Sequence, residues 1–167
     1  MELYLMQHGT CFSKDIDPDQ PLSPVGSEQI AKSAEAVRRL GLSFDCIVAS
    51  PKTRSIQTAQ AVAEAVGYPV ESIVVTDQVK AMTPPAKTAA MLAEYAPPED
   101  EQYAMLICGH LPNLAELASL LMTDQGKARI AFSNGGLTRL DLPPEPGRRA
   151  TLRFCLTPLH LQIIAGG

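Results

Sequence analysis

Short apolar runs alternate with stretches of helical periodicity along the chain. Apolar runs of four to six residues, bounded by Gly, Pro or Ser, indicate buried strands, and they cover residues 3–6, 44–49, 72–76 and 103–108. Between them, apolar residues recur at three- and four-residue spacing, which predicts helices over residues 26–40, 53–66, 84–96 and 113–122. This alternation is typical of βαβ units that share a largely parallel sheet.

The ends of the first two helices carry recognisable signals. Ser27 is expected to cap the first helix. Gly41 and Gly67 follow the last periodic residues and are expected to end the first and second helices. Residues 10–25 are polar and contain three prolines, so they are predicted to form a loop.

The C-terminal part has a different pattern. Residues 136–142 and 151–157 are expected to pair as a hairpin through the Pro- and Gly-rich connection 143–147. His160 lies in a short apolar tail and carries no pattern of a functional site. We therefore expect one α/β domain over residues 1–167: a three-layer α/β/α sandwich with a mostly parallel central sheet and an antiparallel C-terminal hairpin.

Composition narrows the class of protein. Of the 167 residues, 46% are hydrophobic and 19% charged, which is typical of a globular chain. The net charge of −4 argues against partners such as nucleic acid or a membrane surface, which attract basic proteins. No apolar run approaches the roughly 20 residues that span a bilayer. The first residues lack a signal-peptide pattern, so we expect a cytoplasmic protein.

The candidate chemistry lies directly after the predicted strands. His8 follows the first strand, Arg54 opens the helix after the second, and His110 follows the fourth. In sheets of this kind, ligands bind outside the carboxyl ends of the strands. A single histidine in such a place is more often an ordinary turn residue, but two histidines and an arginine at one edge favour an anion site. Helix N-termini there add N–H donors for a group such as phosphate.

Motifs for other kinds of site are not supported, because the residues or the spacing that they require are missing. Asp15, Asp17 and Asp19 imitate the start of a calcium loop, but the required Gly and Glu are missing. Neither GxGxxG after the first strand nor GxxxxGK[ST] occurs, which excludes dinucleotide and P-loop motifs. Cys11 or Cys108 would have to complete a zinc site with the histidines, and the spacing gives no support for it. No metal or cofactor is expected.

Four segments resemble one known family in both order and spacing. They are residues 3–9 (LYLMQHG), 21–26 (PLSPVG), 50–59 (SPKTRSIQTA) and 109–114 (GHLPNL). The chain is similar to the histidine phosphatase superfamily, branch 1, and within it to the short SixA-like phosphohistidine phosphatases. The resemblance implies a phosphoglycerate-mutase-like fold.

The resemblance also implies roles for individual residues. His8 would be the nucleophile that carries the phosphoryl group, Arg54 would bind the phosphoryl oxygens, and His110 would balance charge or protonate a leaving group. Gln7, Gly9 and Gln20 would join Arg54 and His110 in binding phosphate. The implied reaction needs no metal or cofactor, and the implied partner is a phosphorylated histidine-containing phosphotransfer protein or a small phosphate ester.

The chain departs from the family at Gln7 and Gln20, because members have arginine at the first position and often at the second. Glutamine donates a hydrogen bond without charge, so phosphate binding is expected to weaken about tenfold per site. Two alternatives therefore remain beside a phosphohistidine phosphatase. One is a phosphomonoesterase for small molecules, for which Asp77 is the only acid in the stretch 76–82 that could donate a proton. The other is a catalytically degenerate phosphate-binding module.

Overall fold

A six-stranded mixed sheet forms the centre of the computed structural model, with strand order β3-β2-β4-β1-β5-β6. The structure describes residues 1–95, 102–124, 127–144 and 148–166. The strands are β1 (Glu2–Gln7), β2 (Cys46–Ala49), β3 (Val74–Val75), β4 (Ala104–Gly109), β5 (Leu137–Asp141) and β6 (Thr151–Leu156). The helices are α1 (Pro24–Arg39), α2 (Thr53–Val66), α3 (Pro85–Tyr95), α4 (Asn113–Met122) and α5 (Pro158–Ala165).

The pairing of the strands confirms the expected mixture of directions. β1 pairs in parallel with β4, β4 with β2, and β2 with β3. β5 and β6 form the predicted antiparallel hairpin, and β5 joins the sheet by pairing antiparallel to β1. The register places Gln7 opposite Gly109 and Ala49 opposite Cys108, so β1, β4 and β2 end at the same edge.

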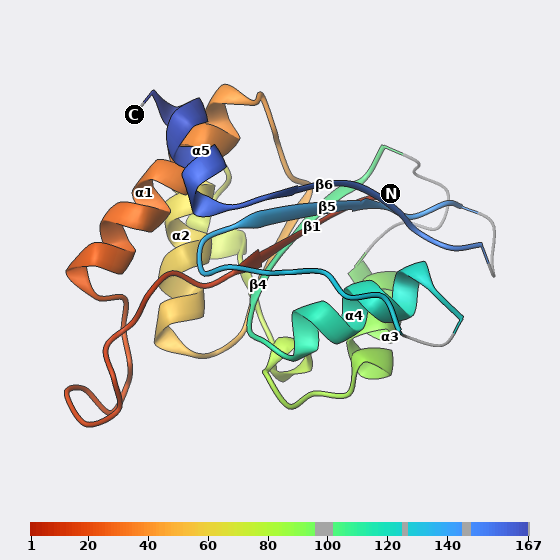
Figure 1. Cartoon of the computed structure of the whole chain (residues 1–167), viewed down its shortest axis with the longest axis horizontal. Coiled ribbons are helices and arrows are strands. Elements are labelled where there is room, and N and C mark those ends of the chain that lie inside the picture. The colour runs from red at the N-terminus through yellow and green to blue at the C-terminus, as the bar shows by residue number, and fades with distance from the viewer. Residues whose placement is uncertain (96–101, 125–126, 145–147, 167) are drawn as a thin grey trace.

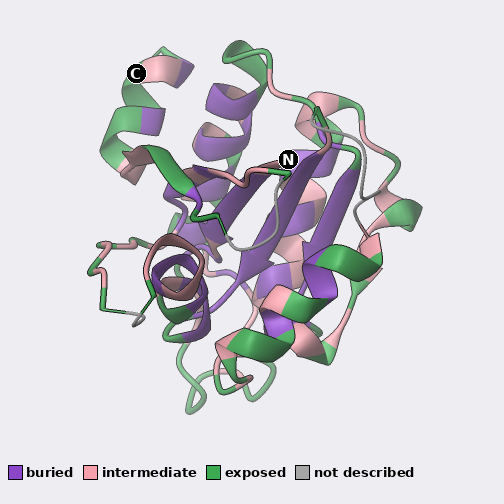
Figure 2. Ribbon diagram, turned by 90° about the vertical axis from the view of Figure 1, so that its right-hand side faces the viewer, coloured by how far each residue is buried: buried purple, intermediate pink, exposed green. Residues whose placement is uncertain are grey.

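Helices cover both faces of the sheet, as expected for a three-layer sandwich (Figure 1). One face packs against α1, α2 and α5, and the other against α3 and α4. The central strands are buried on both sides, while the outward faces of the helices are exposed (Figure 2). Burial on both faces explains why strands such as β4 are continuous apolar runs without alternation.

Three sequence expectations need correction. The cap of α1 is Ser23 and not Ser27, because α1 begins at Pro24 and the Ser23 hydroxyl accepts from the Gly26 N–H. The β-branched run 72–76 yields only the two-residue strand β3, because residues 70–72 form a turn of 3₁₀ helix. These differences leave the order of elements unchanged.

The third correction concerns the C-terminal tail, which is the helix α5. Thr157 caps it, with its hydroxyl accepting from the backbone N–H of His160, and the His160 ring accepts from the Thr157 N–H in return. Pro158 occupies the first helical position, where proline is favoured. Thr157 and Pro158 are therefore a helix start that can be recognised in the sequence, but the residues after them lack the periodicity that predicts a helix. His160 is therefore a structural capping residue.

Other predicted boundaries agree with the structure or lie outside its described part. Gly41 and Gly67 follow α1 and α2 with φ of 68° and 74°, the left-handed conformation that glycine adopts at helix ends. The expected stop before Pro97 and the hairpin tip 145–147 lie outside the described residues.

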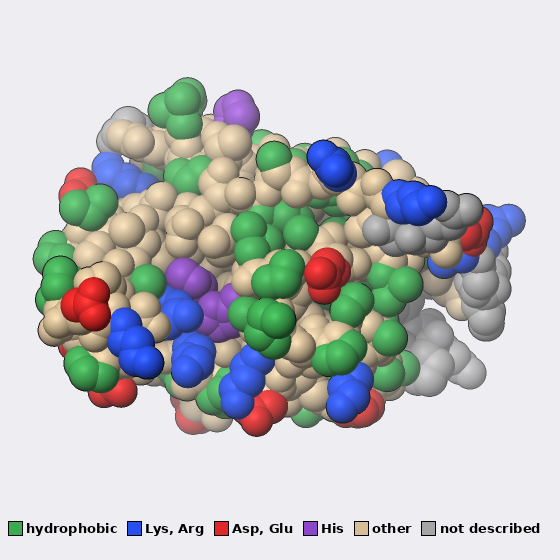
Figure 3. Space-filling model, turned by 60° about the horizontal axis from the view of Figure 1, so that its bottom comes forward, with side chains coloured by type: hydrophobic (Ala, Val, Ile, Leu, Met, Phe, Trp, Pro, Cys, Tyr) green, Lys and Arg blue, Asp and Glu red, His purple; other side chains and the backbone are tan. Residues whose placement is uncertain are grey.

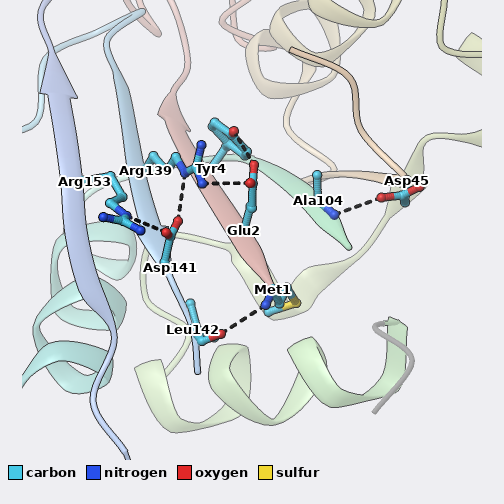
Figure 4. A network of polar contacts seen from close by, with 9 residues as sticks. All are labelled: Met1, Glu2, Tyr4, Asp45, Ala104, Arg139, Asp141, Leu142 and Arg153. Atoms are coloured by element: carbon cyan, nitrogen blue, oxygen red, sulfur yellow. Dashed lines mark hydrogen bonds and ion pairs between the residues drawn. The ribbon is translucent and has the colours of Figure 1, made fainter. Parts of the chain in front are cut away.

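An ionic cluster holds the opposite end of β1, away from the carboxyl edge (Figure 4). Arg139 on β5 pairs with Glu2 at 2.7 Å and with Asp141 at 2.8 Å, and Arg153 on β6 also contacts Asp141. The Tyr4 hydroxyl donates to Glu2, and burial raises the pKa of Tyr4. The cluster joins three neighbouring strands at the end of the sheet that carries no candidate chemistry.

Candidate active site

The candidate residues meet at the carboxyl edge of the three central strands. His8 directly follows β1 and Ser50 directly follows β2, on either side of His110 at the end of β4. The ladder continues one residue past the strands, since the His8 N–H donates to Gly109 at 3.2 Å. Figure 3 shows two histidine side chains together at the surface beside Lys and Arg side chains. The prediction that the two imidazoles lie at one edge is therefore confirmed.

His8 is held in one tautomer by its own loop. Its Nδ1 lies 2.7 Å from the Gly9 carbonyl oxygen, which can only accept, so Nδ1 carries the proton. Nε2 therefore keeps its lone pair. Burial and the nearby Arg54 cation lower the pKa of His8 from its ordinary 6.5, although the Gly9 hydrogen bond opposes this. The ring is neutral at neutral pH and has the form that a nucleophile requires.

Arg54 reaches the site from the first turn of α2. Its Nε–H donates to Nε2 of His8 at 3.1 Å. Its Nη1 is buried and has no hydrogen-bond partner. A buried guanidinium nitrogen without an acceptor is costly, so this donor is suited to an incoming anion.

His110 faces His8 with the ring centroids 4.9 Å apart and the planes at 58°. Its Nε2 lies 2.8 Å from the Ser50 hydroxyl, and both residues are buried. Burial, followed by repulsion from His8 when it is protonated and from the cations of Arg54 and Lys52, lowers the pKa of His110 to about 3. The imidazole is neutral at neutral pH, in a setting that favours entry of negative charge.

Gln7 occupies the end of β1 and faces a second amide. Its Nε2 donates to Asn134 Oδ1 at 3.3 Å, and Asn134 Nδ2 donates to the His8 carbonyl at 2.9 Å. The carbonyl can only accept, which fixes the orientation of both amides and leaves the buried Gln7 Oε1 without a partner. Asn134 thus ties the backbone of the nucleophile candidate to the segment before β5.

Two other residues expected to bind phosphate have different surroundings. The Gly9 N–H donates to the Thr58 hydroxyl at 3.2 Å. Thr58 in turn donates to the Arg54 carbonyl at 2.7 Å, so it links the loop after β1 to α2. Gln20 lies near the end of the loop with φ of 49°, and its backbone N–H donates to Asp17. Among the contacts of the described residues, none joins the Gln20 side chain to His8, Arg54 or His110.

A shallow hollow of about 200 Å³ opens beside these groups. Its lining residues are Lys52, Arg54, Lys80, Ala81, Met82 and His110. Asp77 lies near this wall, but its carboxylate is exposed and pairs with Lys80 at 2.7 Å. Arg54, His110 and two lysines therefore line the hollow without a carboxylate.

The described ranges hold neither a cluster of metal ligands nor a helix that could span a membrane. No group of three His, Cys, Asp or Glu side chains there is arranged to hold a metal ion. No described helix is long and apolar enough to cross a bilayer. The four cysteines are free thiols, of which Cys46 and Cys108 are buried and Cys11 and Cys155 half-buried.

Three residues that support the site were missed from the sequence. Ser50 directly follows the second predicted strand, and that place already indicates the carboxyl edge. Thr58 lies one helical turn after Arg54, a spacing that brings the two together on one helix face. For Asn134, which precedes two glycines before β5, no local sequence signal indicates the contact with His8.

The comparisons with known proteins agree with this geometry. Residues 3–76 match the sequence model of the histidine phosphatase superfamily (branch 1). An uncharacterised protein of Picosynechococcus sp. is 29% identical over 148 residues, which cover 84% of each chain.

Solved structures share the fold at low sequence identity. The protein histidine phosphatase SixA complexed with tungstate has a TM-score of 0.81 at 20% identity, over 96% of this chain and 99% of that one. The α-ribazole phosphatase of Shigella flexneri has a TM-score of 0.71 at 18% identity, over 95% and 97% of the two chains. Residues 3–76 are therefore similar to the histidine phosphatase superfamily (branch 1), and nearly the whole chain shares the fold of SixA.

Proposed function

We propose that the protein is a phosphohistidine phosphatase of SixA type that works through a phosphohistidine on His8. The observation that carries the proposal is the state of the His8 ring: Nδ1–H donates to Gly9 and Nε2 keeps a lone pair beside Arg54. A nucleophilic imidazole needs one nitrogen fixed as a donor and the other unprotonated, and here the lone pair of the unprotonated nitrogen accepts from Arg54 until a phosphoryl group binds.

The first step transfers the phosphoryl group from a histidine of the substrate. The lone pair of His8 Nε2 attacks phosphorus, and an N–P bond forms as the bond from phosphorus to the substrate ring nitrogen breaks. The electron pair of the broken bond stays on that nitrogen. A substrate ring that is protonated on its other nitrogen leaves as neutral imidazole, so the enzyme supplies no proton.

The second step is hydrolysis of the phosphoenzyme. Water attacks phosphorus, the Nε2–P bond breaks, and its electron pair returns to His8. Inorganic phosphate leaves, and the proton lost by the water passes to phosphate or to solvent. Gly9 holds the Nδ1 proton throughout, so the ring returns to the same tautomer.

Arg54 and His110 stabilise the charge on the transferring group. The unpartnered Nη1 of Arg54 gives the phosphoryl oxygens a charge-assisted donor. His110, with its pKa lowered to about 3, enters the reaction as a neutral donor, and an incoming dianion raises that pKa. Phosphoryl transfer depends mainly on positioning and electrostatics, so we propose that it proceeds without a metal or cofactor.

The leaving group favours phosphohistidine over an alkyl ester. An ester releases an alkoxide, which needs a general acid, and Asp77, the only acid in the stretch 76–82, is exposed and paired with Lys80. The partner that follows from this is a cytoplasmic histidine-containing phosphotransfer protein. Residues 1–167 would act as a single domain.

A trapping experiment tests the proposal. The wild-type chain and His8→Ala are incubated with a chemically phosphorylated histidine peptide labelled with ³²P and quenched in alkali, where phosphohistidine survives. We expect an alkali-stable, acid-labile label on the wild type alone, and the same turnover with and without a chelator. Label or turnover in His8→Ala would overturn the mechanism.

The same assay separates the alternatives. Faster turnover of an alkyl phosphate than of the phosphohistidine peptide would favour a phosphomonoesterase. Phosphate or phosphopeptide binding without any turnover would favour a degenerate binding module, as the replacement of arginine by Gln7 suggests.

A further inference from the structure

Two hollows adjoin at the wall of the candidate active site and share Lys80 and Met82. The first contains Arg54 and His110, and the second, of about 380 Å³, extends over the segment 77–84 toward the start of α3. The second hollow is lined by Asp77, Gln78, Lys80, Met82, Thr83, Pro84 and Lys87. A ligand wider than a phosphoryl group therefore meets a continuous surface beside the site.

This surface is positive on a chain whose net charge is −4. Lys52, Arg54, Lys80 and Lys87 line the two hollows, against the single carboxylate of Asp77. That carboxylate pairs with Lys80, while Lys52 and Lys87 are exposed. Local positive charge that opposes the net charge of the molecule favours an acidic partner and steers its approach.

The wall between the hollows is held in place by buried hydrogen bonds. Asn113 at the start of α4 donates from Nδ2 to the Thr83 carbonyl at 2.9 Å and to the Thr88 hydroxyl at 2.8 Å. Thr88 donates in turn to the Gln78 carbonyl at 2.6 Å. The segment is therefore tied to the helix that directly follows His110, and a partner does not have to order it on binding.

Met82 stands out from this fixed wall with 84% of its surface exposed. Leu111, which directly follows His110, is also exposed. Flexible apolar side chains at the centre of a charged surface are typical of protein contacts, because methionine adapts its shape to a partner.

We propose that this surface, formed by Lys52, Lys80, Met82 and Lys87, docks an acidic segment of the protein that carries the phosphohistidine. The inference rests on the function proposed above and adds the chemistry of the partner. Acidic side chains next to the phosphohistidine contact the lysines, and an apolar side chain contacts Met82, while the phosphoryl group reaches Arg54.

Two peptides test the docking surface. They have equal length and one phosphohistidine each, made by chemical phosphorylation, with glutamates flanking it in one and lysines in the other. N-acetyl-phosphohistidine serves as the small substrate. At low ionic strength we expect kcat/KM to be about tenfold higher for the glutamate peptide, with the difference shrinking in high salt.

A matched pair of variants locates the effect. Lys87→Glu is expected to lower kcat/KM for the glutamate peptide about five- to tenfold and to leave N-acetyl-phosphohistidine unchanged. Lys127→Glu makes the same change in net charge at an exposed lysine beyond the other end of α4 and is expected to leave both unchanged.

The outcomes distinguish the two proposals. Equal kcat/KM values for the two peptides, or equal effects of the two variants on kcat/KM, would overturn the docking surface. Turnover of N-acetyl-phosphohistidine in the same experiment would still support the proposed function. Absence of turnover for both peptides and for N-acetyl-phosphohistidine would overturn the proposed function, and the docking surface with it.

Discussion

The Nε–H of Arg54 donates to Nε2 of His8 across 3.1 Å, so the cation occupies the lone pair that attacks phosphorus in the mechanism proposed above. An entering phosphoryl group must therefore take the guanidinium from His8. Because hydrogen bonds to anions are stronger than those to a neutral ring, the exchange is favourable and frees the nucleophile as the substrate binds.

Replacing Arg54 should separate the effect of its charge from that of its shape. Arg54→Gln removes a cation that lowers the pKa of both histidines, so we expect both values to rise in an NMR titration. Arg54→Lys keeps the charge but loses the planar guanidinium with its several N–H donors, so the histidine pKa values should stay near those of the wild type. Turnover should fall about 100-fold or more in both variants. Unchanged turnover in either variant would contradict the role of Arg54.

Gln7→Arg should supply the charge that the resemblance to the histidine phosphatase superfamily implies at this position. Arginine can still donate to Asn134 Oδ1, and it replaces the amide oxygen that is buried without a partner. We expect phosphate to bind about tenfold more tightly, as measured by calorimetry. Weaker phosphate binding together with slower turnover would show that the glutamine serves a different ligand.

Ser50→Ala tests whether the hydroxyl orients His110. Loss of one hydrogen bond to the ring should lower kcat about three- to tenfold with little change in KM. Ser119→Ala is the matched control, because that buried hydroxyl on α4 has no partner and lies outside the site. The control should keep full activity and gain about 0.5 kcal/mol in the free energy of unfolding. Equal activity losses in the two variants would refute the assignment to Ser50.

The stability of the fold should fall in mild acid because of the buried histidines. The pKa of His110 is lowered from 6.5 to about 3, so below pH 6.5 the unfolded chain takes up a proton that the folded chain resists. The free energy of unfolding should then decrease by up to about 1.4 kcal/mol per pH unit for this group between those values. Urea unfolding at several pH values measures it, and His110→Asn should give a shallower slope. An identical slope in the variant would assign the effect to other groups.

The carboxyl edge was predictable because it follows from strand order alone. His8 and His110 each follow a continuous apolar run, and parallel strands bring such residues together whatever the side-chain details. The contact of Asn134 with His8 was not predictable in this way, because it depends on how β5 pairs with β1 and joins two residues that are 126 apart in the chain. The cap of α1 was predicted at the wrong serine for a local reason. Both Ser23 and Ser27 are residues that favour the N-cap position, but Pro24 favours the first helical position, which makes Ser23 the cap.

Two elements show where local propensity fails. The β-branched residues before Thr76 favour a strand, yet only Val74 and Val75 pair with β2, since the chain first turns through a 3₁₀ segment after Pro69. The short helix α5 is apolar nearly all round, so periodicity does not reveal it, and its packing against α1 stabilises it instead.

The bond from Asn134 to the His8 carbonyl has a consequence for how the protein is made. Both neighbours of β1, namely β4 and β5, lie beyond residue 76, where the sequence match to the superfamily ends. During translation, the candidate nucleophile His8 therefore emerges before both strands that flank β1 and before Asn134. A nascent chain or a proteolytic fragment that ends near residue 76 carries the sequence match but lacks His110 and Asn134.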